Sequence, residues 1–269
     1  MEIIEDIEQW RRRYLGWKSD RGDTKKDDLT NYPFVRNRRA PFLPARRALP
    51  MLNLGLISSA GAYIDGTDRF DIQSPDGDLT FREIPSEIEA ADLKFTARGY
   101  DSAAVERDIN SQVPLNRLFE FESNGIIGKL NPVFWSFCGF IPDAARLAEE
   151  MLPLLVERVQ RYEVQATLLI PASVLCHQSV SLVARAIEKA GIPTMTLAVD
   201  KDIIESVRPP RAGLYDGALG SVAGKPEWPE HQRRILDEAL RLIEPMDQAS
   251  VRRLTVNLET QVEKDRGER

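Results

Sequence analysis

The segment from Ser173 to His177 holds the residue types in this chain that are best suited to chemistry. It reads Ser-Val-Leu-Cys-His and lies directly before an apolar segment with helical periodicity. The partial positive charge of a helix N-terminus favours the thiolate form of a nearby thiol, here that of Cys176. His177 is one of only two histidines in the chain and could transfer a proton. The segment therefore predicts a reactive thiol with a proton-transfer group beside it.

Ser173 stands three positions before Cys176, where a Cys-x-x-Cys redox pair would have its first cysteine. The redox pair itself is absent. A structural alternative remains open, in which Cys176 is a small buried hydrophobic residue and Ser173 and His177 only cap the helix.

Cys138 is the second thiol and lies in the aromatic stretch Ser-Phe-Cys-Gly-Phe. Such a setting usually indicates core packing. If Cys138 instead faced Cys176, the two sulfurs could act as opposed acid and base, as in the two-cysteine racemases of α/β fold. Both interpretations of Cys138 stay open on the sequence alone.

The elements around the Ser173–His177 segment form the clearest unit of the chain. Residues 166–170 predict a buried strand, 171–179 a loop, 180–190 a helix closed by a glycine, and 195–199 a second strand parallel to the first. Ligands of parallel α/β sheets bind outside the carboxyl ends of the strands. The predicted loop places the candidate residues at such an end.

The rest of the chain predicts an α/β protein with a parallel sheet, Rossmann-like lobes and βαβ units. Further strands are expected at 52–58, 81–84 and 92–96, and helices at 114–124, 144–162 (kinked or restarted at Pro153) and 230–243. One large unit or two lobes would both suit the length. The predicted divisions are an N-terminal helix and irregular arm (1–50), a first lobe (51–143), a second lobe (144–250) and a charged, frayed tail (251–269).

The arm carries five arginines that could bind an anionic ligand or the carboxylates of a neighbouring subunit: Arg36, Arg38, Arg39, Arg46 and Arg47. The alternative is that the arm is simply solvated.

Composition narrows the class of protein. The net charge of −6 and a pI near 5.2 argue against nucleic acid as a general partner. No apolar stretch is long enough to cross a membrane, the N-terminal residues lack the apolar core of a secretory signal, and two cysteines are too few for a disulfide framework. We therefore expect a cytoplasmic protein. We expect no haem, flavin or nucleotide, because no phosphate-binding glycine loop is present.

Five segments follow one another along about 200 residues, namely FREIPSEI, ERDINSQVPLNRL, NGIIGKLNPVFWSFCGFIPD, LLIPASVLCHQSVSLVARAIEKAGIPT and RPPRAGLYDGALGSVAGKPEWPEHQRRIL. In order and wording they resemble the selenoprotein B family of glycine, sarcosine and betaine reductase components and the similar subunit of D-proline reductase.

The resemblance implies that a selenocysteine or cysteine attacks the carbon bearing the amino group. The family carries this nucleophile in a UxxCH or CxxCH loop that corresponds to Ser173–His177. Cys176 and His177 match that motif, whereas Ser173 stands at the nucleophile position. A hydroxyl is a far poorer nucleophile than a selenolate and cannot form a selenenylsulfide with Cys176.

The first predicted lobe supplies the expected substrate-binding residues, namely Ser59, Gly61, Tyr63, Asp65, Tyr100, Asp101 and Cys138. Two stretches there, GAYIDGTDRFD and TARGYD, lack histidines that the resemblance leads us to expect. Asp65, Asp68, Asp101 and Asp108 could bind a hard cation or an ammonium group, although such aspartates are more often turn and cap residues. No metal site is assigned.

We thus expect an enzyme that acts through Cys176 on a small amino acid or related polar metabolite and cleaves a carbon–heteroatom bond, reductively or without redox change. His177 would manage protons and Ser173 would hydrogen-bond the substrate. The alternatives are an accessory, non-catalytic reductase-like subunit, and proton transfer between Cys138 and Cys176. Expected partners are the small-molecule substrate, another reductase subunit and further copies of the chain as a homo-oligomer.

Overall fold

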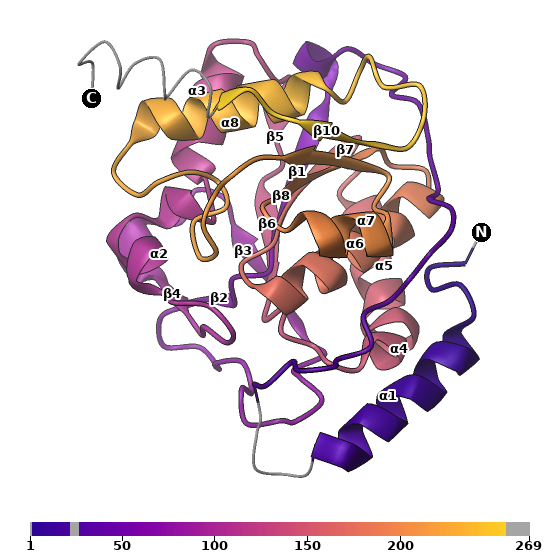
Figure 1. Ribbon diagram of the computed structural model, residues 1–269. Coiled ribbons are helices and arrows are strands. Elements are labelled where there is room, and N and C mark those ends of the chain that lie inside the picture. Colours follow the sequence, from indigo (N-terminus) through magenta and orange to yellow (C-terminus); the bar gives the residue numbers. More distant parts are fainter. Residues whose placement is uncertain (1, 22–26, 257–269) are drawn as a thin grey trace, which may run out of the picture.

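A single, mostly parallel β-sheet organises the computed structural model, which describes residues 2–21 and 27–256 (Figure 1). The strand order is β10-β9-β8-β7-β1-β6-β3, with β5 also beside β1, and β3 is the antiparallel member. The strands are β1 (Asn53–Ser58), β3 (Phe81–Pro85), β5 (Lys129–Leu130), β6 (Val133–Phe137), β7 (Ala166–Ile170), β8 (Thr194–Ala198), β9 (Arg211–Leu214) and β10 (Ser250–Arg253). A separate antiparallel pair joins β2 (Ala62–Ile64) to β4 (Leu93–Phe95).

Helices cover both faces of this sheet and make a three-layer α/β/α fold (Figure 1). Leu54 and Leu56 of β1 pack in the core beneath α3 (Leu115–Ser123) and α8 (Pro229–Arg241), whereas Ile57 packs in the opposite core. This alternation is the two-residue period of a strand that is buried on both faces. The opposite layer contains α4 (Ala144–Arg146), α5 (Leu152–Arg161), α6 (Val174–Lys189) and α7 (Lys201–Val207), with α1 (Ile7–Arg21) packed outside it; α2 (Ala103–Arg107) lies beside the β2–β4 pair.

The predicted interruption of the helix at 144–162 is confirmed. A π-helical turn over Leu147–Met151 separates α4 from α5, and Pro153 occupies the first turn of α5. The helical backbone continues through this turn, since the amide of Leu152 donates to the Leu147 carbonyl, and the π-helical turn accommodates Pro153, which has no amide hydrogen to donate.

The predicted loop at 171–179 is wrong, because α6 begins at Val174 rather than near residue 180. Ser173 caps this helix, so Cys176 and His177 lie within its first turn. The early turns show no apolar stripe since α6 is buried on nearly all sides, and polar side chains such as Gln178 and Ser179 are buried with it. The parallel pairing of β7 with β8 follows the prediction.

The predicted frayed tail at 251–269 is also wrong in its first residues. Residues 250–253 form β10, a parallel edge strand beside β9, which the sequence did not reveal. Residues 257–269 lie outside the described part of the chain. Strands from residues 51–143 and from residues 144–253 share one sheet.

The irregular arm wraps the body as expected and is held by backbone hydrogen bonds. The amide of Val35 donates to Oε1 of Gln178 (2.7 Å), and the amide of Asn37 donates to the carbonyl of Ser206 (2.9 Å). Arg185, buried in α6, donates to the carbonyl of Arg39 (2.8 Å). The backbone of the arm is therefore anchored to the body, and its five arginine side chains are exposed. Within the described residues, no helix is long and apolar enough to cross a membrane.

Candidate active site

The carboxyl ends of three adjacent strands meet around Cys176. Ser59 follows β1, Cys138 follows β6, and Ser173 lies just beyond β7. Backbone hydrogen bonds hold the segments together, from Ser59 N to Ile170 O (3.1 Å) and from Gly139 N to Ser59 O (3.1 Å). This is the edge of a parallel sheet where ligands bind.

Ser173 contacts Cys176 in two ways. Its Oγ accepts a hydrogen bond from the Cys176 amide (3.1 Å), which caps α6, and it lies 3.0 Å from the Cys176 Sγ. A hydroxyl can accept one hydrogen bond while donating its own hydrogen, so Ser173 can donate to the sulfur. The Sγ also lies 3.8 Å from the Ser59 carbonyl oxygen, and Cys176 is 1% exposed. The thiol is thus held at the helix N-terminus with a hydrogen-bond donor against it.

Gly139 leaves the space that the Cys176 sulfur occupies. A Cβ atom built at Gly139 would lie 2.8 Å from the Sγ and 2.5 Å from the Cβ of Ser59. The Ser59 Oγ in turn accepts a hydrogen bond from the Ala172 amide (3.0 Å). Small residues therefore line the side of the thiol that faces β1 and β6.

Backbone groups engage both ring nitrogens of His177. The Val199 amide donates to Nε2 (3.1 Å), so the proton lies on Nδ1, which faces the Ser173 carbonyl oxygen at 2.7 Å. Burial lowers the pKa of His177 and keeps the ring neutral. In this arrangement the ring joins the start of α6 to the end of β8, which supports a positioning role.

Tyr100 and Cys138 complete the wall near the thiol. The Tyr100 hydroxyl donates to the Ala60 carbonyl (2.7 Å), and burial raises its pKa above the ordinary range. Burial, followed by the nearby charge of Cys176, raises the pKa of Cys138 to about 12. Cys138 packs with Tyr63 in a small apolar cluster, which supports the core-packing interpretation of this thiol.

The remaining predicted residues have local structural roles. Gly61 has a φ of +68°, and a Cβ there would lie 2.4 Å from the Thr96 carbonyl oxygen. The exposed Asp65 accepts from the Gly66 amide and Asp101 from the Ala103 amide, both at 3.0 Å. These are turn and cap contacts. Within residues 2–21 and 27–256, no group of three or more histidine, cysteine or acidic side chains is arranged to hold a metal ion.

Sequence reasoning missed Gly99, which lies beside Ser173, and the Phe140 ring and Arg98 next to it. Gly99 has a φ of +78°, and a Cβ there would lie 3.3 Å from the Ser173 Oγ and 2.4 Å from the Phe140 ring. The guanidinium carbon of Arg98 lies 4.6 Å from the centroid of the same ring. The only sequence signal was their position beside Tyr100 and Cys138.

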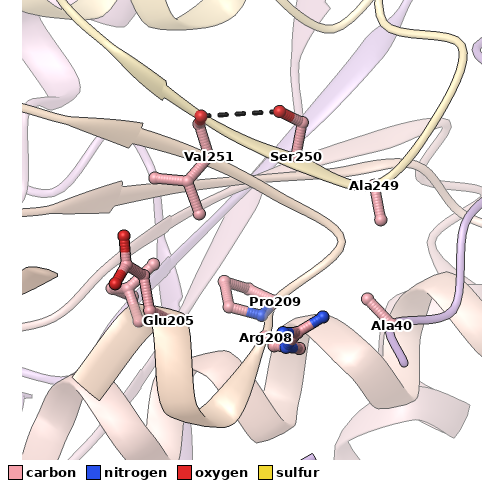
Figure 2. Close-up of a pocket in the computed structure, with 8 residues that line it drawn as sticks. Ala40, Glu205, Arg208, Pro209, Ala249, Ser250 and Val251 are labelled. Carbon is pink, nitrogen blue, oxygen red and sulfur yellow. Dashed lines mark hydrogen bonds between the residues drawn. The ribbon is translucent and has the colours of Figure 1, made fainter. Parts of the chain in front are cut away.

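A pocket of about 360 Å³ lies elsewhere, at the amino ends of β9 and β10 (Figure 2). Parallel strands place this edge opposite the one that carries Cys176. Its lining residues are Ala40, Ile204, Glu205, Arg208, Pro209, Ala249, Ser250 and Val251.

Comparison with known proteins identifies relatives across most of the chain. The family model for glycine/sarcosine/betaine reductase selenoprotein B matches residues 29–172 and ends directly before Ser173. The D-proline reductase subunit gamma of Acetoanaerobium sticklandii is 31% identical over 74% of this chain and 81% of the relative. The glycine reductase complex component B subunit gamma of Symbiobacterium thermophilum is 26% identical over 78% of this chain. The sarcosine reductase complex component B subunit beta of Peptoclostridium acidaminophilum is 29% identical over 63%.

Coverage of the relatives is uneven. The match spans 49% of the glycine reductase subunit and 39% of the sarcosine reductase subunit, in contrast to the D-proline reductase subunit. No solved structure matches this chain.

Proposed function

Because the chain belongs to the glycine/sarcosine/betaine reductase selenoprotein B family, we propose that it is a subunit of an amino-acid reductase complex that acts through Cys176. Its substrate is a small amino acid or a related polar metabolite. The observation that carries the proposal is the placement of Cys176 in the first turn of α6, with the Ser173 hydroxyl 3.0 Å from its sulfur. A helix N-terminus and a hydroxyl donor both favour the thiolate.

In this proposal the Cys176 thiolate attacks the substrate carbon that carries the leaving amino group. A carbon–sulfur bond forms while the carbon–nitrogen bond breaks, and the electron pair leaves with the amine, which takes up a proton. Ser173 donates a hydrogen bond within the site, and His177 holds the start of α6. Because a serine hydroxyl cannot form a disulfide with Cys176, reductive release requires a thiol from another subunit. A non-redox elimination requires none.

The test is to detect the covalent intermediate. The protein is incubated with glycine, sarcosine, betaine or D-proline, and the Cys176-containing peptide is analysed by mass spectrometry. An adduct on that peptide is expected in the wild type and in Cys138→Ala, and none in Cys176→Ala. An adduct on another residue, or none with any small amino acid, would contradict the proposal.

A second candidate function is that of an accessory subunit without catalytic activity. The engagement of both His177 nitrogens by the backbone favours it, together with the hydroxyl at position 173, where the relatives' motif calls for a nucleophile. An accessory subunit would show no adduct, and Cys176→Ala would leave the turnover of a complex that contains it unchanged.

Proton transfer between Cys138 and Cys176 is less well supported. A racemase needs each sulfur to accept a proton in turn, and a thiol with a pKa of about 12 stays protonated at neutral pH.

A further inference from the structure

Arg98 is a buried cation beside the candidate active site. Its side chain is 3% exposed, its Nη1 donates to the Ser74 carbonyl (2.7 Å), and its guanidinium lies over the Phe140 ring. The Ser74 carbonyl and the Phe140 ring hold the guanidinium in place, and the ring is itself buried. Among the described residues its carboxylate partner is Asp27, whose Oδ1 accepts from Nε at 2.8 Å.

Two consecutive residues connect this cation to the thiol. Phe140 stacks against Arg98, and Gly139 adjoins the Cys176 sulfur. The next residue after Arg98 is Gly99, which approaches both Phe140 and the Ser173 hydroxyl. The charge of Arg98 also lowers the pKa of Cys138, against the larger effect of burial. Phe140 and Gly139 therefore form a continuous connection between the cation and the thiol.

The two partners of the ion pair are held very differently. The Asp27 side chain is 58% exposed, while Arg98 is buried. An exposed carboxylate gains little from an ion pair, since water competes for it. A buried guanidinium, in contrast, loses much if it is left without an anion. Exchange of Asp27 for another carboxylate would keep the guanidinium paired.

We propose that Arg98 binds the carboxylate of the substrate, and that Asp27 holds the same position until the substrate displaces it. This inference rests on the proposed function, because it takes the Cys176 site as the substrate site. Within the proposed function it assigns the residue that recognises the carboxylate. Arg98 sets specificity for the carboxylate and takes no part in bond breaking.

The test measures binding by calorimetry on the full chain carrying Cys176→Ala, so that no chemistry intervenes. Glycine and D-proline are compared with glycinamide and D-prolinamide, which keep the amine and lose the carboxylate charge. We expect the acids to bind more tightly than the amides. Arg98→Gln should weaken acid binding by about 10- to 100-fold and leave amide binding unchanged. Asp27→Asn should tighten acid binding by about 2- to 5-fold.

Two controls separate this role from a purely structural one. Arg98→Lys keeps the charge and should retain part of the preference for acids over amides, even if its melting temperature falls. Glu157→Gln breaks an exposed ion pair with Arg161 on α5 and should leave both affinities unchanged.

The outcomes distinguish the inference from the proposed function. The inference would be overturned if Arg98→Gln, added to the Cys176→Ala protein, left the affinity for the acids unchanged. It would also be overturned if the Cys176→Ala protein alone did not bind the acids. The proposed function would still stand if the Cys176 adduct formed. Acid binding that depends on Arg98, without any adduct on Cys176 in the wild type, would support the inference and reject the proposed function.

Discussion

The Sγ of Cys176 lies 3.0 Å from the Oγ of Ser173, and the same oxygen accepts the hydrogen bond that caps the helix carrying the cysteine. The residue at position 173 therefore affects both the local stability of α6 and the environment of the thiol. At this separation a larger atom in place of the oxygen would be within bonding reach of the sulfur after a small shift.

Ser173→Cys should allow a disulfide with Cys176 while the fold is retained. In the reduced state we expect a loss of about 1 kcal/mol in the free energy of unfolding, because a thiol is a weaker cap than a hydroxyl. Thiol counting in denaturant, before and after mild oxidation, measures the bridge. If oxidation never removes the thiols at positions 173 and 176 as a pair, the loop geometry does not permit redox pairing.

Gly139→Ala should impair the thiol site directly. The added methyl would lie 2.8 Å from the Cys176 Sγ, so the sulfur or the backbone must move. We expect a loss of about 1–3 kcal/mol in stability and a change in Cys176 alkylation rate. Gly16→Ala is the matched control, since nothing lies within 4 Å of a Cβ there, and alanine in helix α1 should be neutral or stabilising. If the two substitutions changed stability and alkylation rate equally, the space at Gly139 would not be needed for the Cys176 sulfur.

His177→Gln should change how stability depends on pH. Burial holds the pKa of His177 below its ordinary value of 6.5, so the unfolded chain takes up the proton first as pH falls. His177 therefore contributes fully above about pH 6.5, and its contribution declines below that pH by up to about 1.4 kcal/mol per pH unit until its folded pKa is reached. The difference in unfolding free energy between wild type and variant, measured by urea titration from pH 5 to 8, should shrink toward acid pH. A constant difference would mean that the ring is not held neutral by burial.

Arg211→Met should be among the most destabilising single substitutions. Arg211 and Glu188 form a fully buried ion pair at 2.7 Å, and Glu188 also accepts from the Leu43 amide of the arm (2.7 Å). Removal of one partner leaves a buried charge, at a cost of about 3–5 kcal/mol. Arg161→Met removes an exposed pair and should change stability by about 0.5 kcal/mol or less. Chemical denaturation of both variants tests the contrast.

The βαβ unit around Cys176 was predictable because its strands are short, mostly apolar and β-branched runs between clear breakers. The start of α6 was not, since a helix buried on nearly all sides carries polar residues such as Gln178 without an exposed face. Strand β9 is short and follows two prolines, and β10 is a half-exposed edge, so neither has a strong period-two pattern.

The candidate site was only partly predictable for a different reason. Ser59, Cys138 and Ser173 meet because β6 and β7 flank β1. The local sequence pattern of a strand does not determine its neighbours in the sheet. The contact of Arg98 with Phe140 also depends on that arrangement. The engagement of both His177 nitrogens could not be foreseen, because Val199 lies at the end of another strand.

The reactivity of the two cysteines tests the central claim most directly. The rate of alkylation by iodoacetamide is measured against pH in Cys138→Ala, which keeps Cys176, and in Cys176→Ala, which keeps Cys138. We predict that Cys176 reacts near neutral pH, because the helix end and Ser173 favour its thiolate, while Cys138, with a pKa of about 12, stays unreactive until strongly alkaline pH. If Cys138 reacts faster than Cys176 near neutral pH, Cys176 is not the reactive thiol of this protein.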